Sequence, residues 1–190
     1  MSTAITYSRY GGPEVLTVSQ ADVPQPGPGQ VRIRVRAVAV NPVDAKIRRG
    51  LMDGVFPVRF PVLPGFDVAG VVDAAGEGAS ETVGAEVFGV AAAGGYAEYA
   101  LLDHPVAKPP TVSFENAAAV VTVGEAAFRA LKHLGLKPGQ TLLILGSGRQ
   151  RRHHRRPARR PPGHRRHRDG GRGRPRAAGR ARRDRRPLWG

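Results

Sequence analysis

The chain has 190 residues, 41% of them hydrophobic, and a formal net charge of +15 that is concentrated at one end. Residues 1–148 hold 12 Lys or Arg against 13 Asp or Glu, whereas residues 149–190 hold 18 Arg, no Lys and two Asp. The lack of cysteine excludes disulfide bonds and thiolate metal sites. The first residues show no signal-peptide pattern and no apolar run has the length of a membrane span, so we expect a soluble, cytoplasmic protein with no membrane partner.

The first clear periodicity lies in VRIRVRAVAV, residues 31–40, which follows a loop rich in proline and glycine. Val31, Ile33 and Val35 alternate there with arginines. Because side chains in a strand point to opposite faces in turn, this alternation predicts an antiparallel strand that is buried on one face. The arginines are expected on the solvated face.

A turn at the Asn41-Pro42 pair separates this strand from a segment with helical spacing. Within that segment Asp44 lies four residues before Arg48, a spacing at which opposite charges pair on a helix surface. The sequence therefore predicts a short helix that is braced by a surface ion pair.

Further short strands are expected near residues 66–75, 85–90 and 94–103, because each segment is a short apolar run beside a glycine turn. Many short strands joined by glycine turns favour a barrel or a sandwich over a helical fold.

The pattern changes to helical spacing over residues 113–135, with Ser113 as a candidate N-cap and Gly135 as a candidate stop. Gly124 is a point at which this segment could divide into two helices. The next apolar run, TLLIL at 141–145, is too short for a helix and is typical of a strand buried on both faces of a parallel sheet. A β-rich region followed by a helix and such a strand predicts a barrel domain that leads into a nucleotide-binding domain.

These segments, in this order, resemble the zinc-independent quinone oxidoreductase branch of the medium-chain dehydrogenase/reductase superfamily. The resemblance implies an α+β fold that is mainly β. A GroES-like, partly open β-barrel is expected over residues 1–112, and a connecting helix with the start of a Rossmann NADPH-binding domain over residues 113–148. The stretches that carry the resemblance are GGPEVL, PGPGQVRIRVRAVAVNPVDAKIRRG, PVLPGFDVAGVV, GGYAEYALL, SFENAAAV and LKPGQTLLILG.

The resemblance also implies a function. Members of this branch transfer a hydride from NADPH to a quinone or an activated double bond, and they commonly form homodimers. The expected partner is thus a small quinone or enone, and the expected cofactor is NADPH. Zinc is not expected, because the Gly-His-Glu motif of zinc-dependent relatives reads Gly65-Phe66-Asp67 here and phenylalanine cannot ligate a metal.

Asn41 is the candidate catalytic residue and a candidate cofactor-binding residue, since it matches the family position that faces the nicotinamide end of the cleft. The alternative for Asn41 is a turn-forming role before Pro42. Asp67 matches an acidic family position for which we expect a structural role, and Tyr96 is expected to be a core or cleft-wall aromatic. Ala126 stands where relatives often have Thr, a departure that removes one polar contact to the cofactor.

Gly146, Ser147 and Gly148 are the candidate phosphate-binding residues of the Rossmann turn, which presents the N-terminus of a helix to the cofactor. Arg151 occupies the place of the third glycine of G-x-G-x-x-G. Prolines within residues 157–162 exclude a continuous helix after it. The phosphate-binding motif is therefore incomplete.

Residues 149–190 have two interpretations. As a disordered basic tail, they would bind nucleic acid through its phosphates, although Trp189 alone provides little base stacking. We favour out-of-frame translation of G+C-rich coding DNA from near Gly148, because the segment is built mainly from Arg, Pro, Gly, His and Ala. The chain is then expected to be a truncated, inactive quinone reductase, and nucleic acid is a partner only under the first interpretation.

Overall fold

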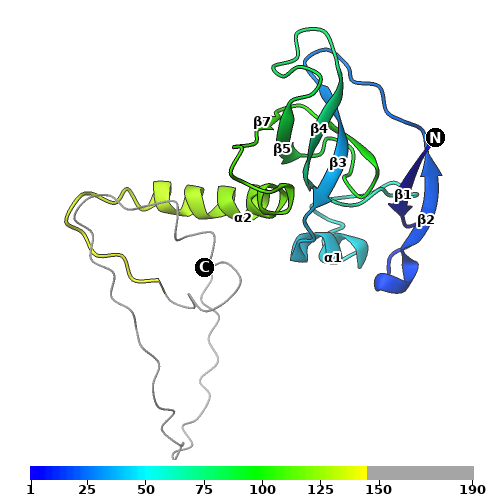
Figure 1. Cartoon of the computed structure of the whole chain (residues 1–190). Helices are drawn as coiled ribbons and strands as arrows, with labels where there is room; N and C mark the ends of the chain where they lie inside the picture. The colour runs from blue at the N-terminus through cyan, green and yellow to red at the C-terminus, as the bar shows by residue number, and fades with distance from the viewer. Residues whose placement is uncertain (145–190) are drawn as a thin grey trace, which may run out of the picture.

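The computed structural model describes residues 1–144, which form two β-sheets and two α-helices (Figure 1). The larger sheet has the strand order β6-β3-β4-β5-β7. The smaller sheet pairs β1 with β2. All strand pairs within these residues are antiparallel. The strands are β1 Ser2–Thr6, β2 Thr17–Ala21, β3 Val31–Val38, β4 Asp67–Ala75, β5 Glu86–Val90, β6 Tyr99–Leu102 and β7 Val106–Ala107.

The helical elements lie between and after the strands. A short 3-10 helix, η1 Pro13–Val15, connects β1 to β2. Helix α1 Pro42–Arg48 follows β3, and helix α2 Phe114–His133 follows β7. The strands that were expected at 31–40, 66–75, 85–90 and 94–103 all form, with somewhat different bounds, whereas β1 and β2 were not predicted.

The core lies on one face of β3 and its neighbours. Val31 and Ile33 have no exposed surface, while Arg34 and Arg36 are exposed, so the alternation predicted for this strand is confirmed. An isolated bridge joins Ala91, just after β5, to Leu102 of the edge strand β6. Because this bridge brings the edge strand β6 next to the end of β5, the larger sheet curves into the partly open barrel that was expected. The core residues are Val31, Ile33, Val68, Val72, Val87, Ala91, Ala100 and Leu102.

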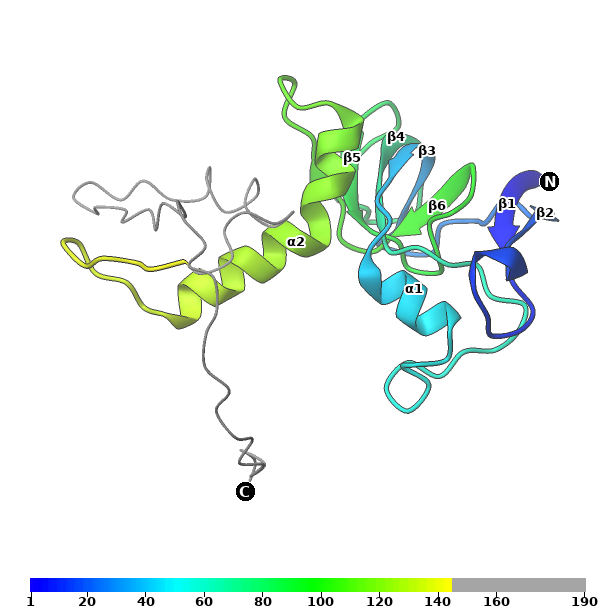
Figure 2. The same cartoon turned by 90° about the horizontal axis from the view of Figure 1, so that it is seen from below.

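Helix α2 begins where its cap was predicted, because the Ser113 hydroxyl accepts a hydrogen bond from the Asn116 N–H at 3.3 Å. It ends at His133, two residues before Gly135, whose φ of +55° is a backbone conformation that favours glycine. The helix runs through Gly124 without a break, so it is not divided into two helices. It does change direction part-way along its length (Figure 2).

Only the first half of α2 is packed on the sheet. Ala117 and Ala118 are fully buried and form a small cluster with Ala69 of β4. The second half extends away from the sheets (Figure 2), and Phe128 on it is 61% exposed. Within the part of the chain that the structure describes, no helix is long and apolar enough to span a bilayer.

The strand expected at 141–145 is not formed over its described part, since residues 141–144 have no strand assignment. The physical reason is that a strand in a parallel sheet requires hydrogen-bonded neighbours, and residues 1–144 form antiparallel pairs only. The expectations for the Gly146-Ser147-Gly148 turn and for the basic segment 149–190 lie outside the described residues.

Candidate functional site

A buried hydrogen-bond network joins three elements at the first residue of β4. Asp67 Oδ2 accepts hydrogen bonds from Asn41 Nδ2 at 2.8 Å and from the Thr122 N–H at 3.1 Å. Asp67 Oδ1 accepts a third hydrogen bond from Thr122 Oγ1 at 2.6 Å. Asp67 is 1% exposed and Asn41 7% exposed. The network therefore fixes the start of α1 against the middle of α2 through one carboxyl group.

Thr122 is a member of this network that no sequence pattern predicts. It lies in an apolar helical run, AAAVVTVG, where a single Thr has no distinctive pattern. Its backbone N–H donates to the Asp67 carboxyl group, and a side chain that intervenes in the helical hydrogen-bond ladder is a recognised cause of helix bending. This contact is the physical reason that we assign to the change of direction in α2.

Asn41 lies at the N-cap of α1, where Pro42 is the first helical residue. Its backbone N–H donates to Asp44 Oδ2 at 2.6 Å, which is one half of the capping-box pattern. Asn41 thus ends the extended chain after β3 and begins the helix, as a turn-forming residue would. Its side-chain amide nitrogen also donates a hydrogen bond to Asp67. Asn41 therefore both forms the turn and belongs to the buried hydrogen-bond network.

Asp44 is buried, and the surface ion pair predicted between it and Arg48 is wrong. Asp44 is 7% exposed, and its carboxyl group is directed to the N-terminus of its own helix rather than to solvent. Its Oδ2 also accepts a hydrogen bond from the Tyr96 hydroxyl at 3.3 Å. Arg48 instead donates from Nε to the Gly11 carbonyl at 3.4 Å. The capping interaction and burial outweigh the weak i,i+4 attraction.

Tyr96 reaches Asp44 because of the glycine at position 65. Gly65 has a φ of +95°, and a Cβ at this position would lie 2.2 Å from Cδ1 of the Tyr96 ring. Any side chain there would collide with the ring and would also occupy a strained backbone conformation. Gly65 therefore permits the close packing that places the Tyr96 hydroxyl beside the Asp44 carboxyl group.

Burial is the largest influence on the pKa values of Asp44 and Tyr96. Burial raises the pKa of Asp44 above its ordinary value, the hydrogen bonds from Asn41 and Tyr96 oppose the rise, and the nearby Asp67 charge adds to it. Burial, followed by the Asp44 charge, raises the pKa of Tyr96. The cluster therefore favours the neutral forms of both Asp44 and Tyr96.

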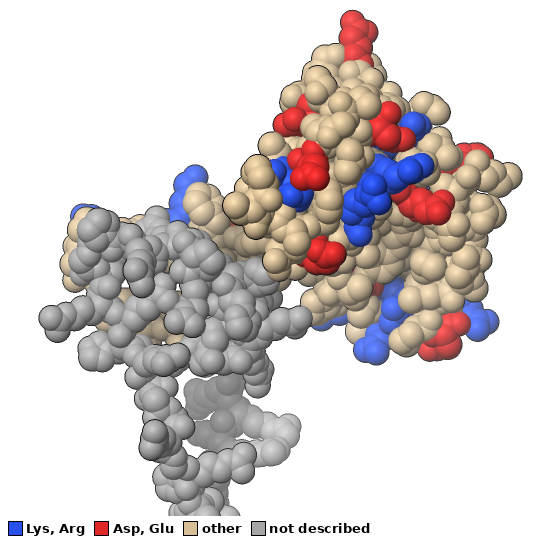
Figure 3. Space-filling model, in the orientation of Figure 1, with Lys and Arg blue, Asp and Glu red and all other residues tan. Residues whose placement is uncertain are grey.

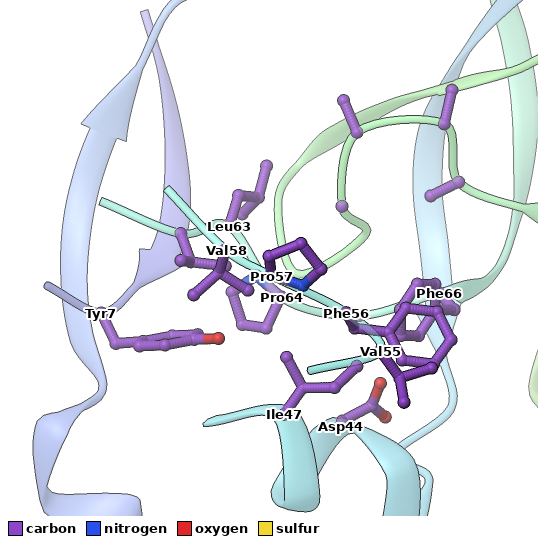
Figure 4. A pocket seen from close by; sticks show the side chains of 16 residues that line it. Tyr7, Asp44, Ile47, Val55, Phe56, Pro57, Val58, Leu63, Pro64 and Phe66 are labelled. Carbon is purple, nitrogen blue, oxygen red and sulfur yellow. The ribbon is translucent and has the colours of Figure 1, made fainter. Parts of the chain in front are cut away.

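A cavity of about 350 Å³ lies next to Asp44 (Figure 4). The Asp44 carboxyl group lies beside Ile47 and Val55, and the Tyr7 hydroxyl points toward the same space. Burial raises the pKa of Tyr7, which is 1% exposed. The remaining wall is almost entirely apolar and includes Phe56, Pro57, Val58, Val62, Leu63, Pro64 and Phe66. Such a cavity suits an uncharged, mainly apolar molecule.

Among residues 1–144 no group of three or more His, Cys, Asp or Glu side chains is arranged to hold a metal ion. Phe66, at the position where zinc-dependent relatives carry His, is part of the cavity wall. The other candidate site residues, Gly146, Ser147 and Gly148, lie outside the described part of the chain, so their role stays a prediction.

Comparison with known proteins agrees with this architecture. Residues 27–111 match the family model of the alcohol dehydrogenase GroES-like domain. The chain is 44% identical over 150 residues to a quinone oxidoreductase of Lama guanicoe, a match that covers 76% of this chain and 45% of the relative.

Solved structures show the same similarity. An alcohol dehydrogenase superfamily protein from Novosphingobium aromaticivorans superposes with a TM-score of 0.77 at 30% identity, over 87% of this chain and 52% of that one. A mycobacterial protein solved in complex with NADPH has a TM-score of 0.66 at 32% identity, over 74% of this chain and 43% of that one.

The curled antiparallel sheet, the helix that leaves it and the buried network define a GroES-like domain of the medium-chain dehydrogenase/reductase type. Over the matched residues the chain is similar to the quinone oxidoreductase branch of that superfamily. It spans less than half of the length of the curated quinone oxidoreductases that it matches, 45% for the guanaco protein.

Proposed function

We propose that residues 1–144 form the substrate side of an NADPH-dependent quinone reductase, which transfers a hydride to a quinone or to an activated double bond. The observation that carries this proposal is the apolar cavity that adjoins a buried polar cluster, in a chain whose relatives include quinone oxidoreductases. An uncharged ring fits an apolar wall, and a few fixed polar groups suffice to orient it.

In this proposal NADPH supplies the hydride, and the protein supplies position and polarity. Asn41 is proposed to contact the nicotinamide end, because it matches the family position that faces this end of the cleft and because Asp67 holds its amide nitrogen in place. Asp67 acts as a positioning residue, and Thr122 fixes the orientation of its carboxyl group. The phosphate groups are assigned to Gly146, Ser147 and Gly148, which lie outside the described residues.

A complete nucleotide site requires more than the described residues contain. A Rossmann domain is built on a parallel sheet, and the strand pairs within residues 1–144 are all antiparallel. We therefore propose that the catalytic-side residues act only in combination with a nucleotide-binding half, and that the 190-residue chain by itself neither binds NADPH tightly nor turns over.

The alternative function, nucleic-acid binding through residues 149–190, has no supporting observation. The segment lies outside the described residues. On the face shown in Figure 3, basic and acidic side chains of the described part lie among one another rather than in one basic patch.

The test is a chimera in which residues 1–144 are joined to the nucleotide-binding half of human quinone oxidoreductase. The chimera is expected to consume NADPH in the presence of a quinone, while the 190-residue chain does not. A chimera that folds and binds NADPH but reduces neither quinones nor enones would show that this domain serves another reaction.

A further inference from the structure

The Tyr7 hydroxyl group has no hydrogen-bond partner among residues 1–144, although Tyr7 is only 1% exposed. Among the same residues, Asp44 Oδ1 is the one polar side-chain atom that is both fully enclosed and without a partner. The Tyr7 hydroxyl also lacks a partner, so it is not fully enclosed. Part of the small surface that Tyr7 still exposes therefore belongs to its hydroxyl group.

This hydroxyl group lies at one end of the apolar cavity. Tyr7 belongs to the cavity wall, and its hydroxyl points toward the interior (Figure 4). Phe66 lies on the opposite side of the same space (Figure 4), and it directly precedes Asp67, which binds Asn41 in the buried network. The Tyr7 hydroxyl is thus at the end of the cavity that is remote from this network.

The position of the Tyr7 ring is fixed from two directions. The Tyr7 N–H donates to the Val62 carbonyl at 3.0 Å, and the Val62 N–H donates to the Tyr7 carbonyl at 2.8 Å. The ring packs edge-to-face on Phe60, with the ring centroids 6.0 Å apart. The hydroxyl group is therefore held in place before a ligand binds, and a fixed polar group in an apolar wall is what gives a small-molecule site its specificity.

The hydroxyl group is available as a hydrogen-bond donor. Burial raises the pKa of Tyr7, and the Arg48 charge opposes the rise. The hydroxyl therefore keeps its proton at neutral pH and can donate it. A ligand that covers this group without accepting its proton leaves a buried donor unsatisfied, which is unfavourable, whereas a ligand with an acceptor there satisfies it.

We propose that Tyr7 determines ligand specificity, because its hydroxyl donates a hydrogen bond to a neutral acceptor atom of an uncharged, mainly apolar ligand. The acceptor lies at the end of the ligand that is directed away from Phe66. That this ligand is a substrate, with its reacting end toward Asn41 and Asp67, rests on the proposed function. Tyr7 then selects substrates by the end that does not react.

The test measures binding to the full 190-residue chain by NMR titration, without NADPH. The two probes have the same shape: benzonitrile carries a nitrogen that accepts a hydrogen bond, and phenylacetylene has a C–H group in its place. Tyr7→Phe removes only the hydroxyl group. It is expected to weaken the binding of benzonitrile about tenfold, the effect of one buried hydrogen bond, and to leave the affinity for phenylacetylene unchanged.

Tyr10→Phe is the matched control. The Tyr10 ring also packs edge-to-face on Phe60, with the ring centroids 5.1 Å apart, but its hydroxyl donates to Asp53 at an exposed position outside the cavity wall. The ratio of the two affinities should therefore be the same in Tyr10→Phe as in the unmodified chain. Thermal melting establishes that each variant is folded.

Infrared spectroscopy provides a measurement that does not depend on the folding of a variant. Hydrogen bonding raises the nitrile stretching frequency of benzonitrile. The probe bound to the unmodified chain should therefore absorb above its frequency in an apolar solvent. In Tyr7→Phe the frequency should fall toward the value in that solvent.

The proposal is overturned if neither probe binds, if Tyr7→Phe leaves the ratio of the two affinities unchanged, or if bound benzonitrile absorbs at its apolar-solvent frequency. Because no cofactor or turnover is involved, these results are independent of the chimera assay. An active chimera, combined with binding that is indifferent to Tyr7, would reject this inference and leave the proposed function intact. An inactive chimera, combined with benzonitrile binding that depends on Tyr7, would do the reverse.

Discussion

Asp67 and Thr122 are 55 residues apart in the sequence, yet two hydrogen bonds join them, from Thr122 Oγ1 to Asp67 Oδ1 at 2.6 Å and from the Thr122 N–H to Asp67 Oδ2 at 3.1 Å. This pair connects the start of the central β4 to the middle of α2. Only the first half of α2 is packed on the sheet. The pair therefore lies near the end of the segment of α2 that contacts the barrel.

The Thr122 hydroxyl is expected to contribute measurably to stability. In Thr122→Val, Asp67 loses the shortest of its three hydrogen bonds while it remains buried, so the free energy of unfolding should fall by about 1–3 kcal/mol. Thr122→Ser, which retains the hydroxyl, should lose much less. Urea denaturation of the two variants measures the difference, and equal stability of Thr122→Val and the unmodified chain would contradict the assigned network.

Asn41→Ala should lower the kcat/KM of the chimera, although the variant is still expected to fold. Without the amide, the proposed contact to the nicotinamide end is lost, and the value of kcat/KM is expected to fall by about ten- to a hundredfold. Arg36→Ala, at an exposed position of β3, is the control and should be active. Unchanged kcat/KM in a folded Asn41→Ala chimera would assign this residue to the turn alone.

The raised pKa of Asp44 predicts a pH-dependent stability difference between the unmodified chain and Asp44→Asn. A carboxyl group whose pKa is higher in the folded state contributes stability below the unfolded pKa, and this contribution is lost as the pH rises through the folded pKa. Asp44→Asn keeps an acceptor for both donors and cannot ionise. It should therefore be more stable than the unmodified chain at neutral pH, with a difference that shrinks toward the ordinary Asp pKa of about 3.9.

Denaturation of both proteins across this pH range provides the measurement. Subtraction of the two curves removes the contribution of the other titrating groups. A stability difference that is constant with pH would mean that Asp44 has an ordinary pKa in the folded state.

Gly65→Ala is expected to be strongly destabilising because the new methyl group collides with the Tyr96 ring. The matched control is Gly78→Ala: Gly78 also has a positive φ, +70°, but has nothing within 4 Å of an added Cβ. The control should lose about 1 kcal/mol from backbone strain alone, and Gly65→Ala about 2 kcal/mol more from the steric clash. Similar melting temperatures for the two variants would show that Tyr96 moves aside without cost.

The features that were predicted correctly are those with a local cause. The alternation in residues 31–38 depends on the period of two in a strand, the start of α2 on the hydroxyl of Ser113, and its end on the conformational freedom of Gly135. The GroES-like domain and the quinone oxidoreductase branch were also predicted correctly, because ordered family motifs are a property of the sequence itself. The domain boundaries at residues 112 and 148 stay predictions.

The candidate site depends on tertiary structure in a way that no local pattern indicates. Asp44 has the spacing of a surface ion pair, and only the packing of α1 against the segments around Tyr7 and Tyr96 turns it inward. Thr122 has the appearance of an ordinary helical residue until β4 brings Asp67 to it. Sequence patterns with a local cause predicted the strands of the larger sheet, the two ends of α2 and the family that the chain resembles. Burial and contacts between distant residues decided which polar groups meet, because both exist only after the chain has folded.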